Sequence, residues 1–346
     1  MRTARKRLPR GFRRNMTMPE KFKLLFNTCT DPYFNLALEE YLLCRRGENF
    51  FMLWRNSKSV IVGRNQNTRV EINAPFVREN SIAVVRRLTG GGAVFHDEGN
   101  INYTFIENGT AHINDYSFFS APVINALEKA GVKAELSGRN DLLARGGKIS
   151  GAAQCLKNNR VLHHGTLLYS ADLSQLEKAL NVNLLKTESK GIKSVRSRVL
   201  NIACLLENPP SVQDFASDFF EQIKSVSGGE IFSLSAAEVS EINALADEKY
   251  RTDKWNYGEK GNFSLRFEKR LPQGCFDANL DVENGIITKI RLYGDYFANG
   301  EISELESAFI GVKYDYESVK SACEAVPVSG YLPGVAPGAF AEILGL

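Results

Sequence analysis

The chain has 346 residues, of which 43% are hydrophobic and 24% charged, a composition typical of a globular protein with one large and one smaller domain. Seven basic residues and no acidic ones lie within the first fourteen, so the rest of the chain carries a net charge of about −4. This balance excludes the basic body of a nucleic-acid-binding protein. No apolar run approaches the roughly 18 residues of a membrane span, so we expect no membrane association.

The six cysteines lie far apart and form no C-x-x-C pair, which argues against a zinc site and a disulfide framework. A reducing, cytoplasmic location fits this pattern best. The basic segment at residues 1–20 has three interpretations. We expect a disordered extension, because glycine, proline and scattered arginines offer no apolar face. The alternatives are an organelle transit segment and an arm that binds polyanions.

The first half of the chain alternates strands and helices. Asp31-Pro32 supplies an N-cap followed by proline at the first helical position, so the sequence predicts a helix over 32–45. A second helix at 117–130 should end at Gly131. Arg145-Gly146-Gly147-Lys148 is predicted to be a hairpin turn. Strands are expected at 21–27, 50–54, 59–63, 82–86, 102–106 and 164–170, and further helices at 173–180 and 211–224.

A boundary is expected near 245–260, which divides the chain into a domain of residues 21–250 and a domain of residues 251–346. Strands are predicted at 262–270, 275–282 and 286–293, the last two joined by Asn284-Gly285, a strong hairpin signal. A helix should follow at 315–325, and the segment 327–338, rich in Pro and Gly, is predicted to be loop. The fold class is therefore α+β: mixed sheets packed with helices, then a small α+β module.

The strongest candidate for chemistry is the segment 86–97, R-R-L-T-G-G-G-A-V-F-H-D. Three glycines between two strands allow positive φ and let a ligand approach main-chain N–H groups. With Arg86 and Arg87 beside them, such a loop suits a phosphate. A plain β-turn is an equally good interpretation from these residues alone. The motif is not G-x-G-x-x-G, which excludes a Rossmann site.

A second candidate is the segment 138–152, G-R-N-D-L-L-A-R-G-G-K-I-S-G-A. Lys148 stands at a hairpin end beside small residues, where it could neutralise a carboxylate and the phosphate that the carboxylate attacks. Most lysines at turns are simply solvated, and this interpretation stays open. His163 and His164 begin the segment H-H-G-T-L-L. Adjacent strand residues face opposite ways, so we expect no shared metal ion, one packed histidine and one exposed histidine.

These three segments, in this order, resemble the signature of the lipoate–protein ligase A family, within the biotin/lipoate protein ligase superfamily. Weaker similarities are found at 34–40, 60–67 and 191–198 and, for a small accessory domain, at Trp255-Asn256-Tyr257-Gly258. The resemblance implies the biotin/lipoate ligase fold with a C-terminal accessory domain. It implies an enzyme that uses ATP and Mg²⁺ to convert lipoate to lipoyl-AMP and then transfers the lipoyl group to a lysine of apo-lipoyl domains.

The resemblance also implies a set of site residues. Lys148 is the expected catalytic residue. The expected acceptors are lipoyl domains of 2-oxoacid dehydrogenase complexes and the glycine cleavage H protein, and the enzyme is expected to be a monomer. An apolar slot for the lipoyl tail could include Phe34, Leu38 and Val94, which fit an ordinary core equally well. The nucleotide-binding residues expected from the resemblance are Arg87, Gly91, Gly92, Ala93, Val94, Phe95, His96, Asn140, Asp141 and Lys148.

The sequence differs from the family pattern at two places, and the same fold allows one alternative function. Leu88-Thr89 replaces a smaller, more polar pair, so whether Thr89 offers a hydroxyl to the ligand stays open. Ala152-Ala153 replaces Ser/Thr-Ala. The rival is an octanoyl- or lipoyl-transferase on the same fold that would use Cys155 as a thioester nucleophile without ATP. The accessory domain and the 86–97 element favour the ligase.

Overall fold

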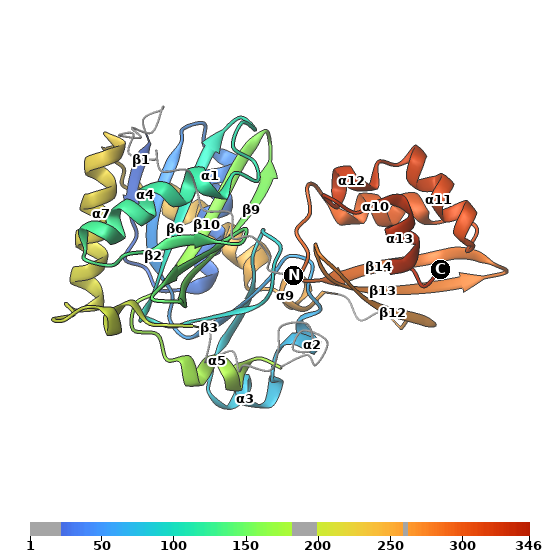
Figure 1. The fold of residues 1–346 in the computed structure, drawn as a ribbon, viewed down its shortest axis with the longest axis horizontal. Coiled ribbons are helices and arrows are strands. Elements are labelled where there is room, and N and C mark those ends of the chain that lie inside the picture. Colours follow the sequence, from blue (N-terminus) through green and yellow to red (C-terminus); the bar gives the residue numbers. More distant parts are fainter. Residues whose placement is uncertain (1–21, 182–198, 259–261) are drawn as a thin grey trace, which may run out of the picture.

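The computed structural model describes residues 22–181, 199–258 and 262–346, which form a larger and a smaller lobe (Figure 1). The expected extension at 1–20 and the similarity at 191–198 lie outside these ranges. The fold class is α+β as expected, because each lobe packs helices against strands that are mostly antiparallel.

The larger lobe is built on an eight-stranded sheet of order β11-β1-β2-β6-β10-β9-β8-β7. Its strands are β1 (Lys23–Phe26), β2 (Phe50–Arg55), β6 (Asn100–Asn108), β7 (Glu135–Ser137), β8 (Asp141–Ala144), β9 (Gly147–Lys157), β10 (Arg160–Leu168) and β11 (Glu230–Ile231). One face is covered by α4 (Tyr116–Lys129) and α7 (Val212–Ser227), whose buried side chains share a core with Tyr103 and Phe105. The other face is covered by α1 (Pro32–Arg45) and α8 (Ala236–Leu245).

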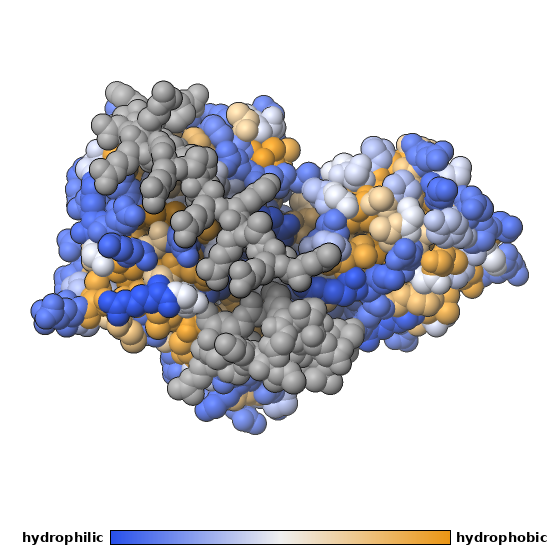
Figure 2. All heavy atoms as spheres, in the orientation of Figure 1, coloured by the Kyte–Doolittle hydropathy of each residue, from blue (hydrophilic) through white to orange (hydrophobic). Residues whose placement is uncertain are grey.

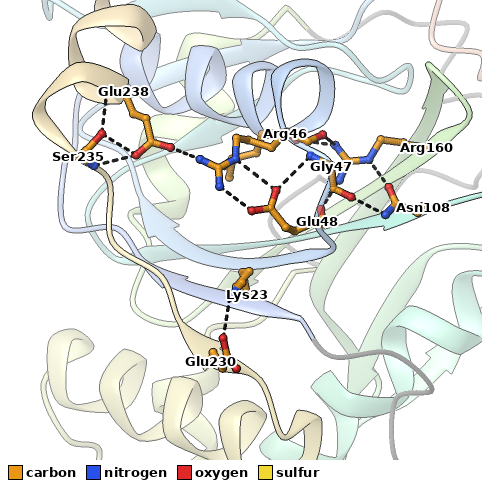
Figure 3. Close-up of polar contacts among 10 residues, drawn as sticks. Lys23, Arg46, Gly47, Glu48, Asn108, Arg160, Glu230, Ser235 and Glu238 are labelled. Atoms are coloured by element: carbon orange, nitrogen blue, oxygen red, sulfur yellow. Dashed lines mark hydrogen bonds and ion pairs between the residues drawn. The ribbon is translucent and has the colours of Figure 1, made fainter.

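Helix α1 lies where the sequence predicts it. The Asp31 side chain accepts a hydrogen bond from the Tyr33 amide, and Pro32 occupies the first turn. The guanidinium of Arg160 on β10 donates to the carbonyls of Leu42 and Leu43, each at 2.7 Å, at the C-terminal end of the helix. The same guanidinium donates to Asn108 Oδ1 (Figure 3). A buried cation thus satisfies carbonyls that the helix leaves unpaired and fixes α1 to the sheet.

A second sheet, of order β4-β3-β5, carries the triple glycine. Its strands are β3 (Ser59–Val62), β4 (Ala83–Arg86) and β5 (Val94–His96), and the helices packed near it are α2 (Thr68–Glu71), α3 (Ala74–Glu79) and α5 (Leu173–Ala179). The loop between β4 and β5 holds Gly90–Gly92. A turn of π-helix (Ala246–Tyr250) follows α8, and α9 (Asp253–Tyr257) then packs against β4 and α2.

The smaller lobe packs helices on one face of the sheet β12-β13-β14. Its elements are β12 (Leu265–Leu271), β13 (Gly274–Glu283), β14 (Ile286–Gly294), α10 (Ile302–Phe309), α11 (Tyr316–Ala325), α12 (Val328–Tyr331) and α13 (Pro337–Ile343). The prediction of loop over 327–338 is wrong, since α12 and the start of α13 lie there. Pro337 begins α13 rather than breaking a helix, and Phe340 and Ile343 then reach the core.

Polar and apolar side chains are mixed over the face of both lobes that Figure 2 shows. Among the described residues, the large apolar side chains that stay exposed are scattered singly: Val70, Ile231, Ile310 and Tyr316. No helix within residues 22–181, 199–258 and 262–346 is long and apolar enough to cross a bilayer.

Candidate active site

Arg86 and Arg87 form the base of the triple-glycine loop, and both are buried. The Arg86 guanidinium donates to the carbonyls of Gly63 and Gln66 at 2.9 and 2.7 Å. It also donates to the carbonyl of Trp255 at 2.9 Å, which joins α9 to the base of the loop. Arg86 is therefore a scaffold residue, because its donors are directed at the backbone rather than outward.

Arg87 holds the loop from inside. Its Nη2 donates to the carbonyl oxygens of Gly90 and Gly92 at 2.7 and 2.9 Å, and its Nη1 to the carbonyl of Ile61 at 3.1 Å. Its donors are therefore engaged within the protein, where they turn the carbonyls of Gly90 and Gly92 inward.

The two arginines are surrounded mainly by neutral acceptors. Burial lowers the pKa of each guanidinium to about 10, so both remain charged at neutral pH. Charge buried at the base of a loop of backbone N–H groups attracts an anion above it. The electrostatics of this loop therefore favour a phosphate-containing ligand.

The glycines of the loop serve different purposes. Gly91 has φ +91°, a conformation that side chains rarely adopt, and a Cβ there would lie 3.0 Å from Arg87 Nη2. A Cβ on Gly90 would lie 2.5 Å from the Tyr296 carbonyl, and one on Gly63 would lie 1.9 Å from the Gly91 carbonyl. Gly92 is exposed and has nothing within 4 Å of its Cβ position. Only Gly92 is thus open on its Cβ side to an approaching ligand.

The smaller lobe reaches the loop through Tyr296 and Phe297. The Gly91 amide lies 3.4 Å from the Tyr296 carbonyl, and the Phe297 ring packs against Gly91. The Arg139 guanidinium lies 4.2 Å from the centroid of the same ring. The ring therefore joins the triple glycine to the 138–152 segment. Neither Tyr296 nor Phe297 was expected near the site, and no local pattern in the sequence marks them.

Lys148 lies at the start of β9, after the hairpin turn that the sequence predicts. Arg145 and Gly146 both have positive φ, at 46° and 81°. Lys148 Nζ lies 2.7 Å from Asp141 Oδ1 on β8, and both side chains are about one-third exposed. A Cβ on Gly151 would lie 2.9 Å from Lys148 Nζ. Gly151 therefore leaves space for the ammonium, which stays accessible to a ligand.

The other predicted nucleotide-binding residues differ in what they offer. Asn140 Nδ2 donates to the Ala152 carbonyl at 2.6 Å, so its amide braces β9. The Phe95 side chain lies in the core of the second sheet and can contribute only backbone. Ala93 and Val94 are half-buried. They and Gly92 thus form the accessible part of this stretch.

His96 is buried and retains one unpaired ring atom. Its Nδ1 lies 3.1 Å from Asn56 Nδ2, while its Nε2 has no hydrogen-bond partner. Burial and, to a smaller extent, the positive charge of Arg87 lower the pKa of His96 to about 3. A neutral imidazole with an unsatisfied nitrogen is suited to bind a polar ligand atom rather than to carry charge.

The adjacent histidines face opposite sides of the sheet, as expected. His163 stacks on Phe119 with ring centroids 4.7 Å apart, and burial lowers its pKa well below the usual value. His164 faces α1, where its Nδ1 lies 2.9 Å from Glu39 Oε1. The expectation that one of them is exposed is wrong, because each lies beneath a layer of helices. Among the described residues, no group of three or more His, Cys, Asp or Glu side chains could hold a metal ion.

Cys155 does not have the environment of a nucleophile. Burial, with the nearby Glu39 carboxylate, raises the pKa of its thiol to about 12. A catalytic cysteine requires the opposite shift, since the thiolate is the reactive form. The structure therefore gives no support to the thioester-forming transferase.

Comparison with known proteins agrees with this geometry. Residues 31–224 match the family described as lipoyl protein ligase A/B catalytic domain, and residues 260–344 match the bacterial lipoate protein ligase C-terminus. Lipoate–protein ligase 1 of Staphylococcus aureus is 39% identical over 299 residues, covering 86% of this chain and 91% of its own length. Lipoate-protein ligase LplJ of Bacillus subtilis is 39% identical over 321 residues, covering 91% and 97%.

Solved structures give the same result. The chain is similar to P. falciparum LipL1 in complex with lipoate, with a TM-score of 0.74, 25% identity and coverage of 88% of this chain and 94% of that one. It is similar to a bipartite ligase of Thermoplasma acidophilum described with its E2 lipoyl domain, with a TM-score of 0.62, 26% identity and coverage of 71% and 99%. A lipoate-protein ligase A bound with ATP gives a TM-score of 0.60, 25% identity and coverage of 69% and 99%. The chain therefore belongs to the lipoate–protein ligase family.

Proposed function

We propose that this protein is an ATP-dependent lipoate–protein ligase, which activates lipoate as lipoyl-AMP and then transfers the lipoyl group to a lysine of a lipoyl domain. The observation that carries the proposal is the arrangement of Lys148 with the Gly90–Gly92 loop. Phe297 and Arg139 link the loop to the strand pair that holds the lysine. Family relatives named as lipoate ligases, one of them bound with ATP, support the same activity.

In the first step a carboxylate oxygen of lipoate attacks the α-phosphorus of ATP, the P–O bond to the β-phosphate breaks, and pyrophosphate leaves. Both reactants are anions, so the barrier falls only if fixed cations and N–H donors hold them together. Lys148 is placed to neutralise both anions. The loop, with the buried charge of Arg87 beneath it, would receive the phosphates.

In the second step the neutral amine of the acceptor lysine attacks the carbonyl carbon of the mixed anhydride. An amide bond forms, the bond from the acyl carbon to the AMP oxygen breaks, and the amine loses a proton. Lys148 can stabilise the charge on the departing phosphate. No cysteine takes part, which agrees with the raised pKa of the Cys155 thiol.

Magnesium is proposed to accompany ATP. Asp141, beside Lys148, offers one carboxylate, and Mg²⁺ commonly binds through one or two carboxylates together with substrate phosphates. Asp141 would therefore hold the ion, whose chemistry is to offset charge on the triphosphate. Among the described residues, a single carboxylate beside the phosphates fits this way of binding Mg²⁺, whereas no group of three or more His, Cys, Asp or Glu side chains could hold the ion alone.

The finer assignments belong to the same proposal. His96 Nε2 and the backbone of Gly91–Phe95 contact the nucleotide, while Asn140 fixes β9 beneath it. The acceptors include the lipoyl domains of 2-oxoacid dehydrogenases and the glycine cleavage H protein. The protein acts in the cytoplasm as a monomer. The two domains meet after α9, because α9 packs on β4 of the larger lobe.

Exchange of labelled pyrophosphate into ATP, measured with and without lipoate, tests the proposal. A ligase shows lipoate-dependent exchange and lipoylates an apo-lipoyl domain only when ATP is present. Acyl transfer from an octanoylated protein without ATP, together with no exchange, would establish the transferase instead.

A further inference from the structure

Arg87 is one end of a chain of buried hydrogen bonds that reaches helix α1. Arg87 Nε donates to Thr89 Oγ1 at 2.9 Å, and Thr89 Oγ1 lies 2.8 Å from His164 Nε2. His164 Nδ1 in turn lies 2.9 Å from Glu39 Oε1. Thr89, His164 and Glu39 are 0%, 9% and 2% exposed. Little water can therefore reach these side chains to compete for their hydrogen bonds.

The carboxylate at the far end is itself held in place. Thr104 Oγ1 donates to Glu39 Oε1 at 2.6 Å, and Trp54 Nε1 donates to Thr104 Oγ1 at 2.9 Å. Glu39 thus receives hydrogen bonds from two strands of the large sheet. Its negative charge lies at the opposite end of the chain from the positive charge of Arg87.

Donor and acceptor capacities fix the direction of the two outer bonds in this chain. A carboxylate only accepts, so His164 Nδ1 carries the hydrogen that is shared with Glu39. A guanidinium only donates, so Thr89 Oγ1 accepts from Arg87. The Thr89 hydroxyl has one hydrogen and a second lone pair, and with these it joins Arg87 to His164 Nε2.

We propose that Thr89, His164 and Glu39 are positioning residues that hold Arg87 in the orientation that shapes the phosphate-binding loop. The proposal deepens the ligase function and rests on it. Arg87 has two of its N–H groups on the carbonyls of Gly90 and Gly92, so any rotation of its guanidinium moves the loop. Thr89 holds the Nε–H of Arg87, His164 holds Thr89, and Glu39 fixes the hydrogen on His164 Nδ1.

The expected effect of breaking the chain is kinetic. N–H donors stabilise a developing charge only when they are held ready for it, because reorganisation would otherwise cost part of the gain. Thr89 has no contact with substrate in this arrangement, since its hydroxyl is fully engaged and buried. The hydroxyl of Thr89 is therefore not offered to the ligand in this arrangement. Thr89 acts through Arg87.

Thr89→Val removes the hydroxyl at nearly constant volume, and Thr89→Ser retains it. We expect Thr89→Val to lower lipoate-dependent pyrophosphate exchange roughly 10- to 100-fold, the usual effect of losing a hydrogen bond to a charged group. The loss should fall on kcat and on the KM for ATP, with the KM for lipoate nearly unchanged. Thr89→Ser should stay within a few-fold of the parent. Thr288→Val on β14 is the matched control, because Thr288 contacts only the neighbouring strand.

A second readout does not depend on activity. The chain has four histidines, so ¹⁵N spectra of histidine-labelled protein are simple, and His164→Gln identifies the His164 signals. The parent should show His164 with a hydrogen on Nδ1, and Glu39→Gln should lose this fixed Nδ1–H together with exchange activity. A His164 that carries its hydrogen on Nε2 alone would overturn the proposal.

The two proposals fail in different ways. If the parent shows the expected tautomer but no lipoate-dependent exchange, the ligase function is wrong while the hydrogen-bond chain stands. If the parent exchanges and Thr89→Val matches it in kcat and in the KM for ATP, the positioning role is wrong. Thr89→Val with a lowered melting temperature but parental kinetics would show a purely structural role and would also overturn the proposal.

Discussion

Lys148 Nζ is held 2.7 Å from Asp141 Oδ1, yet both side chains remain about one-third exposed. An ion pair this accessible contributes at most about 1 kcal/mol to stability. Lys148 can therefore exchange its partner for the anions of a substrate at little cost.

Lys148→Ala should lower pyrophosphate exchange by about 10²- to 10³-fold, the typical effect of losing one electrostatic stabiliser of the transition state. The melting temperature should change little, since the pair is accessible. Lys129→Ala, on the exposed end of α4, is the matched control for loss of a lysine. Exchange by Lys148→Ala within a few-fold of the parent would contradict the assignment.

Gly91→Val should weaken binding of a non-hydrolysable lipoyl-adenylate analogue sharply, because a β-branched residue resists the φ of +91° found there. Gly92→Ala tests a different cause of weak binding, a side chain that occupies the space of the ligand. Among the residues that the structure describes, and apart from its two chain neighbours, none has an atom within 4 Å of this Cβ position, so reduced binding by this variant would come from a clash with the ligand itself. Calorimetric titration measures both, with Gly47→Ala as the control for an unobstructed glycine. Parental affinity in Gly91→Val would leave the loop as an ordinary turn.

Cys155→Ser should keep most of the ATP-dependent lipoylation of an acceptor domain. The raised pKa of the thiol leaves almost no thiolate at neutral pH, and the phosphate anhydride makes a thioester unnecessary. Mass spectrometry of the parent after incubation with lipoate and ATP should show no acyl group on Cys155. Detection of that thioester, with transfer abolished in Cys155→Ser, would restore the transferase.

Glu40 should make the free energy of unfolding depend on pH in the acid range. Its carboxylate accepts from Lys249 Nζ at 2.6 Å, Tyr250 Oη at 2.8 Å and Lys157 Nζ at 3.1 Å. Burial by itself raises the pKa of Glu40, but the two lysines and the tyrosine outweigh it, and the net pKa is below the ordinary 4.5. Burial lowers the pKa of Lys249 from its usual value, and the Glu40 carboxylate opposes this shift.

A carboxyl whose pKa is lower in the folded state stabilises the fold above its unfolded pKa, and that stabilisation is lost as the pH falls through the folded value. The urea midpoint of the parent should therefore fall between about pH 5 and about pH 3. Glu40→Gln should be less stable near pH 7 by about 1–3 kcal/mol and should fall less steeply below about pH 5. Glu128→Gln, exposed on α4, is the control. Parallel curves for Glu40→Gln and the parent would exclude this role for Glu40.

Local chemistry allowed much of the fold to be predicted. Asp31-Pro32 fixed the start of α1, and the turns at Arg145-Gly146 and Asn284-Gly285 have the positive φ values that their hairpins require. These features depend on residues next to one another, so their energies can be estimated without knowing the rest of the chain. For the same reason the contiguous 86–97 and 138–152 segments could be identified from the sequence as candidate site elements.

The tertiary structure alone decided what these segments contact. Gly90 must be small because the Tyr296 carbonyl of the smaller lobe lies against it, and Glu39 meets His164 across 125 residues of sequence. Arg87 directs donors at the carbonyls of Gly90 and Gly92 and also at that of Ile61 on β3. Such contacts depend on how sheets and lobes pack. Periodicity and turn chemistry describe only the neighbours of a residue along the chain, so they could not reveal which distant residue lies against it.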